Sequence, residues 1–152
     1  MSELTICPLL AEVELSYKTK IKPSQRPQLN DSKKVYDYLL DVWTGNIEYF
    51  EEFVVVFLNR HNKALGWKKI SQGGVAGTVV DVKLILQGAI LANASGIVLA
   101  HNHPSGNTRP SEGDLALTKK IQAACKFMDI NIIDHIIVTT ENYYSFADEG
   151  NL

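Results

Sequence analysis

Residues 99–114, "LAHNHPSGNTRPSEGD", carry the pattern on which the interpretation of this chain depends. A short apolar run, "IVLA" at residues 97–100, leads directly into two histidines, His101 and His103, that are one residue apart. A Pro-Ser-Gly turn follows, and a serine and an aspartate three residues apart close the segment. The pattern raises two alternatives, a metal site or a simple turn.

The spacing of these residues predicts a metal site. If the strand continues through His101, the side chains of His101 and His103 point to the same side, because strand side chains alternate with a period of two. Pro110 and Ser111 are typical of a helix start, and the first turn of that helix then holds Asp114. Two imidazoles and one carboxylate, with a position left for water, form the pattern of catalytic zinc. Manganese and iron accept the same ligand types.

A purely structural interpretation stands beside this one. "SEGD" is a capping-box sequence, in which Ser111 accepts from a backbone N–H and the acidic side chain of Asp114 reaches back. A lone pair of histidines on an exposed turn is also more often solvated than bound to a metal. The conjunction of a buried strand, the two histidines, and a serine and aspartate at a helix start favours the metal site.

Composition limits the possible classes. The chain has 152 residues, 45% of them hydrophobic, which suits one domain with a substantial core. A formal charge of −2 gives no overall attraction to nucleic acid, although local patches are compatible with it. Cys7 and Cys125 form no CxxC pair, which fits a reducing cytoplasm. No segment approaches the roughly 18 apolar residues of a membrane span, and no targeting segment is recognisable, so we expect a soluble cytoplasmic protein.

Hydrophobic periodicity predicts an α/β fold. We expect helices from a cap at Ser32 to Gly45, from Val82 to a terminator at Gly96, and after Ser111 through Met128. We expect strands at "FVVVFLN" from Phe53, "ALGWKKIS" from Ala64, "IVLA", "INIIDHIIVTT" from Ile130 and "NYYSF" from Asn142. Helices interleaved with buried strands indicate a mixed sheet flanked by helices.

The first 30 residues are expected to form a strand and an extended arm. "AEVELSY" alternates charged and apolar residues, which predicts a half-buried edge strand around residues 12–15. "KTKIKPSQRPQLN" carries two prolines and several cations, which indicates an extended arm that wraps the domain or a partner, including a second copy of the chain. Residues 31–152 then form the main domain.

The run "HNHPSGNTRPSEGD" resembles the JAMM metal motif, His-x-His-Pro followed by Ser-x-x-Asp, of the JAB/MPN metallopeptidase superfamily, and specifically its RadC-like branch. The likeness extends from about Glu51 and includes "EEFVVVFLNR", "SQGGVAGTVVD", "HNHPSG" and "DHIIV". It implies an α-β-α sandwich like that of cytidine deaminases over residues 31–152. It also implies one zinc ion held by His101, His103 and Asp114, with a water that attacks an amide carbonyl.

The resemblance also implies an upstream glutamate as general base. Aligning the branch's Glu-x-aromatic strand start with "EEFVVV" favours Glu51, and Glu52 is the fallback; without the resemblance, both would be assigned to a solvated strand end. By the same resemblance, Ser111 donates a hydrogen bond to the oxyanion.

Three further polar residues are candidates for the surroundings of the site. His135 is expected to be a core histidine rather than a fourth ligand, which would close the site to water. Asp134 either orients a ligand histidine or is a solvated strand-edge residue. His61 is expected to be exposed.

The leading functional hypothesis is a zinc hydrolase of peptide or isopeptide bonds. The glycine-rich stretch "SQGGVAG" of this hydrolase would accept an extended substrate tail by strand addition.

One alternative is a factor linked to nucleic acid or DNA repair, which would use cations of the arm (Lys18, Lys20, Lys22 and Arg26). Longer RadC-like proteins carry a helix-hairpin-helix-like region before the domain, whereas only the strand, arm and first helix are expected to precede it here. A non-catalytic interaction domain is the other alternative. Deaminase chemistry is disfavoured because the sequence has no PCxxC pair.

Overall fold

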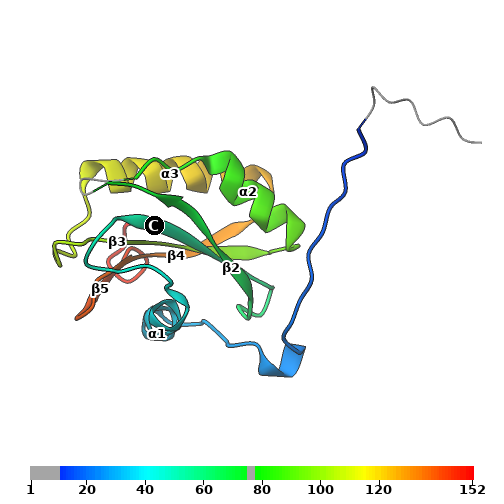
Figure 1. Cartoon of the computed structure of the whole chain (residues 1–152), viewed down its shortest axis with the longest axis horizontal. Helices are drawn as coiled ribbons and strands as arrows, with labels where there is room; N and C mark the ends of the chain where they lie inside the picture. Colours follow the sequence, from blue (N-terminus) through cyan, green and yellow to red (C-terminus); the bar gives the residue numbers. More distant parts are fainter. Residues whose placement is uncertain (1–10, 75–77) are drawn as a thin grey trace, which may run out of the picture.

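The computed structural model describes residues 11–74 and 78–152 and confirms the predicted α/β fold (Figure 1). Five strands form one sheet in the order β2-β1-β3-β4-β5. The strands are β1 (Glu52–Leu58), β2 (Ala64–Gln72), β3 (Gly96–Asn102), β4 (Asn131–Val138) and β5 (Tyr143–Ser145). The helices are α1 (Ser32–Val42), α2 (Val82–Leu91) and α3 (Glu112–Phe127), preceded by a short 3-10 helix, η1 (Pro23–Gln25).

The sheet is mixed and lies between two helical layers. β3 and β4 are parallel, whereas the β1–β2, β1–β3 and β4–β5 pairs are antiparallel. α2 and α3 cover one face, and α1 covers the other (Figure 1). β1 and β3 are buried along their whole length, as expected for central strands whose sequences lack polar alternation.

Strand parity decides which layer a side chain of β1 enters. Phe53, Val55 and Phe57 belong to the core cluster beneath α2 and α3. The alternate residues, among them Val54 and Val56, belong to the cluster that packs against α1. This parity also separates Glu51, which precedes β1, from Glu52, which begins it.

Two predicted helix boundaries were wrong. Asp31, not Ser32, caps α1, because its carboxylate accepts a hydrogen bond from the backbone N–H of Lys34 at 2.9 Å. α2 ends at Leu91 rather than before Gly96, and Asn93, two residues later, adopts a left-handed φ of 51°. Gly96 instead begins β3, where a Cβ atom would lie 3.1 Å from the Ile133 side chain.

The predicted edge strand around residues 12–15 was also wrong. No strand forms among residues 11–22, and the side chains of Val13 and Leu15 are 82% and 75% exposed. Alternation alone does not create a strand when no neighbouring strand accepts its backbone hydrogen bonds. The later part of this segment lies against the domain, because the Tyr17 hydroxyl donates to the Leu65 carbonyl of β2 at 2.6 Å. Among the described residues, Leu29 is the first in the core cluster against α1. Cys7 and residues 75–77 of the glycine-rich stretch lie outside the described residues.

Among the described helices, none has both the length and the apolar composition needed to cross a membrane.

Candidate metal centre

The C-terminal end of the central strand β3 positions the two histidines. His101 is paired with Phe53 of β1, and the two rings are stacked with centroids 6.1 Å apart, so His101 faces the layer of α2 and α3. His103 follows the last residue of β3. The chain then turns sharply, because the N–H of Gly106 donates to the His103 carbonyl at 2.9 Å with a φ of 81° at the glycine.

The start of α3 positions Asp114. Ser111 Oγ accepts from the backbone N–H of Asp114 at 3.1 Å, and Asp114 Oδ2 accepts from the backbone N–H of Ser111 at 2.8 Å. The capping box is therefore real. It does not exclude the metal site, because the same carboxylate also faces the histidines.

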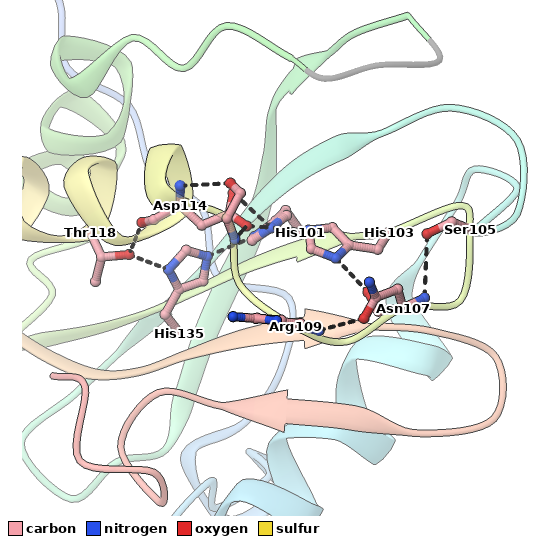
Figure 2. Close-up of polar contacts among 9 residues, drawn as sticks. His101, His103, Ser105, Asn107, Arg109, Asp114, Thr118 and His135 are labelled. Carbon is pink, nitrogen blue, oxygen red and sulfur yellow. Dashed lines mark hydrogen bonds and ion pairs between the residues drawn. The ribbon is translucent and has the colours of Figure 1, made fainter.

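Three potential ligand groups converge at this point (Figure 2). His101 Nε2 lies 3.3 Å from Asp114 Oδ1, and His103 Nε2 lies 3.3 Å from Asp114 Oδ2. The two Nε2 atoms are 3.0 Å apart. All three ligand atoms lie within 4.8 Å of one another. Two imidazoles and one carboxylate fit a catalytic zinc ion, which takes three protein ligands and keeps one open position.

The electrostatics of the cluster favour an ionised carboxylate. Burial opposes ionisation of Asp114, but hydrogen bonds from His101 and His103 outweigh it and hold the pKa of Asp114 well below its usual range. Burial also acts to lower the pKa of His103, yet hydrogen bonds to Asp114 and to the Asn107 carbonyl raise it overall. The carboxylate of Asp114 therefore supplies a negative charge where a cation would bind.

A backbone carbonyl orients His103. His103 Nδ1 lies 2.6 Å from the carbonyl oxygen of Asn107 (Figure 2). Because a carbonyl can only accept, Nδ1 carries a proton, so in a neutral His103 the lone pair is on Nε2, the nitrogen that faces the cluster and could bind a metal. The loop that supplies this carbonyl is stabilised by the Asn107 side chain, which accepts from the N–H of Arg109 at 3.0 Å.

The two glutamates before and at the start of β1 lie in different environments. Glu51 lines a cavity of about 350 Å³ that also contains His101, His103, Ser111 and Asp114. Glu52 is buried and forms an ion pair with Lys69, with Oε1 2.8 Å from Nζ. Thus Glu51 lies beside the cluster of ligands, and Glu52 interacts with β2.

The side chain of Asn102 holds the segment before β1 in place. Its Oδ1 accepts from the backbone N–H of Glu52 at 2.7 Å. Its amide nitrogen donates to the carbonyls of Ile47 and Phe50. Glu51 is thereby placed between two anchored positions.

His135 is a buried core histidine, as expected, and it contacts His101 on the side away from the cluster. Both expectations for Asp134 were wrong. Its carboxylate is buried and accepts from the Ser145 hydroxyl at 2.6 Å and from the Ala147 N–H at 3.1 Å, and burial raises its pKa. Asp134 therefore ties the C-terminal segment to β4. His61 is exposed, as expected.

Sequence reasoning missed Thr118 and Asn107. Thr118 follows Asp114 by four residues and therefore lies on the same face of α3, which is a signal that helical spacing provides. Asn107 acts through its backbone carbonyl, so its residue type carries no signal for that contact.

Comparison with known proteins identifies the family. The family model described as "RadC-like JAB domain" matches residues 29–151. The chain belongs to the RadC-like JAB family. A UPF0758 protein of Porphyromonas gingivalis is 40% identical over 149 residues, which cover 95% of this chain and 63% of the relative.

Two further relatives match a shorter part of this RadC-like JAB protein. A UPF0758 protein of Flavobacterium johnsoniae is 49% identical over 100 residues, or 66% of this chain and 44% of the relative. The UPF0758 protein YfjY of Escherichia coli is 37% identical over 102 residues, or 67% of this chain and 64% of the relative. The chain thus spans about half to two thirds of the length of these relatives.

Proposed function

We propose that this RadC-like JAB protein is a zinc-dependent metallopeptidase that hydrolyses peptide or isopeptide bonds. The observation that supports it best is the convergence of His101, His103 and Asp114 in a cavity that Glu51 also lines. Three of the groups suit a metal with an open coordination position. The fourth is a carboxylate in the same cavity that is available for proton transfer.

Each side chain then has a defined role. A bound zinc ion would supply Lewis acidity and lower the pKa of a water molecule to about 7. Glu51 accepts a proton from the attacking water and delivers it to the leaving amine. Ser111 accepts from the N–H of Asp114 in the capping box, which leaves its own hydroxyl proton free to donate to the oxyanion.

The position of β2 supports an extended peptide tail as the substrate. β2 is an edge strand of the sheet, and its last residue, Gln72, is paired with Glu52. The next residue, Gly73, donates its N–H to the Glu51 carbonyl at 2.8 Å. A peptide that adds to this end of β2 would therefore run toward the cavity that Glu51 lines.

Removal of the metal tests the proposed function. We expect the zinc-loaded protein to cleave members of a quenched-fluorescence library of peptide and isopeptide-linked substrates. Chelation should reduce cleavage to background, and about one equivalent of zinc should restore it. Cleavage that persists in protein shown to be free of metal would contradict the proposal, as would a zinc-loaded protein that cleaves no substrate of either type.

Replacement of Ser111 by alanine should affect both rate and stability. We expect kcat to fall about 10²–10³-fold, the usual effect of losing one oxyanion donor. Loss of the cap should also lower the free energy of unfolding by about 1 kcal/mol. Ser111→Thr keeps a hydroxyl and should recover both. Steady-state kinetics and thermal unfolding check this, and a normal kcat in a destabilised Ser111→Ala protein would limit Ser111 to capping.

A further inference from the structure

A chain of hydrogen bonds leads from His101 into the core and returns to Asp114 (Figure 2). His101 Nδ1 lies 2.8 Å from His135 Nε2, and His135 Nδ1 lies 2.7 Å from the Thr118 hydroxyl. That hydroxyl is in turn 2.6 Å from the backbone carbonyl of Asp114. The chain therefore begins and ends at two of the residues proposed to bind zinc.

The direction of every hydrogen bond in this chain follows from its last link. The carbonyl of Asp114 can only accept, so the single hydroxyl proton of Thr118 points to it, as is common for threonine in helices. Thr118 Oγ1 must then accept from His135, which places a proton on His135 Nδ1. In a neutral ring, His135 Nε2 is consequently an acceptor, and the partner nitrogen of His101, Nδ1, must carry a proton.

The opposite direction is unfavourable. It would turn the Thr118 proton toward His135, so that lone pairs of the hydroxyl and of the Asp114 carbonyl would face each other across 2.6 Å. It would also place a proton on His101 Nε2, the atom that faces the cluster, and so prevent that nitrogen from binding a metal.

The packing around His135 supports a fixed, neutral ring. The ring is fully buried and stacks on Phe146, with centroids 4.4 Å apart and planes 14° apart. Phe53 contacts it edge-on at 5.7 Å. Apolar contacts on two sides hold the ring orientation that both hydrogen bonds require, and they disfavour a charged imidazole.

We propose that Thr118 and His135 are positioning residues that hold His101 in the Nδ1–H tautomer, so that its Nε2 lone pair faces the metal position. The inference rests on the proposed metal site and adds residues to it. In this proposal, different kinds of hydrogen-bond acceptor at Nδ1 orient the two histidines. A backbone carbonyl orients His103, whereas His101 depends on side chains that can be replaced.

Zinc affinity of Thr118 variants tests the proposal. Thr118→Val has nearly the same shape but lacks the hydroxyl, and we expect its zinc affinity to fall about 10–100-fold, as is typical for groups that orient metal ligands. Thr118→Ser keeps the hydroxyl and should bind zinc nearly as tightly as the wild type. Thr139→Val is the matched control, because it removes another buried hydroxyl, one that donates to Asn142. It should lower the melting temperature without changing zinc affinity.

Affinity is measured on the full chain by competition with a chromophoric chelator, and nitrogen-15 NMR of the imidazole rings of the metal-free protein provides the second readout. We expect His101 and His135 of the wild type to carry their protons on Nδ1, and Thr118→Val to mix the tautomers of both. An Nδ1 of His101 without a proton in the wild type would overturn the proposal, as would unchanged zinc affinity in Thr118→Val. A wild type that shows the Nδ1–H tautomer but binds no zinc would instead refute the proposed metal site.

Discussion

Replacement of Glu51 by glutamine is expected to lower peptide hydrolysis by about 10²–10⁴-fold while zinc stays bound. Glutamine has nearly the same shape as glutamate but cannot accept a proton from the attacking water. Glu51 lines the cavity of the cluster without being one of its three convergent ligands, so the metal should be retained. Measurement of kcat/KM together with zinc content separates loss of chemistry from loss of metal.

Glu52→Gln is the matched control, since it makes the same chemical change one residue away. The Glu52 side chain is buried and pairs with Lys69 rather than facing the cavity. We expect hydrolysis to be retained and the free energy of unfolding to fall by about 1–3 kcal/mol, because a charged hydrogen bond is lost. The reverse outcome, an inactive Glu52→Gln protein beside an active Glu51→Gln protein, would move the general base to Glu52.

Replacement of Asp114 by asparagine should remove most of the zinc affinity. Asparagine keeps an oxygen that can accept from the N–H of Ser111, so the start of α3 should still form. It loses the negative charge that faces His101 and His103. We expect affinity to fall by more than the roughly 10–100-fold that outer groups contribute.

Chelator competition measures the affinity of Asp114→Asn, and the melting temperature of the metal-free protein monitors folding. If this protein folds and binds zinc as tightly as the wild type, Asp114 is not a ligand.

Local rules of sequence explain much of the candidate site. The period of two along a strand places His101 and His103 on one side, and the capping signal places Asp114 in the first turn of α3. Strand parity also separates Glu51 from Glu52 once the pairing of Phe53 with His101 is known. The first two features depend on neighbours within a few residues of the chain, whereas the third also requires the pairing of β1 with β3.

Features that depend on distant parts of the chain could not be predicted. The contact between His135 and His101 requires the parallel pairing of β3 with β4, and the Thr118 contact requires α3 to pack over β4. The buried position of Asp134 could not be predicted either, because its partners, Ser145 and Ala147, come from the segment that folds back after β4.

In the N-terminal segment, the local pattern predicts a strand that the described residues do not form. Residues 12–15 have the alternation of a strand, but the described part of the fold pairs no strand with them. Local pattern therefore specifies a strand only where the sheet offers it an edge.

The most direct test of the proposed metal site is the zinc content of the purified protein, measured by elemental analysis after zinc is supplied, for the wild type beside His103→Ala. We expect about one zinc ion per chain in the wild type and almost none in the variant. No bound zinc in the wild type, or equal zinc in both proteins, would contradict it.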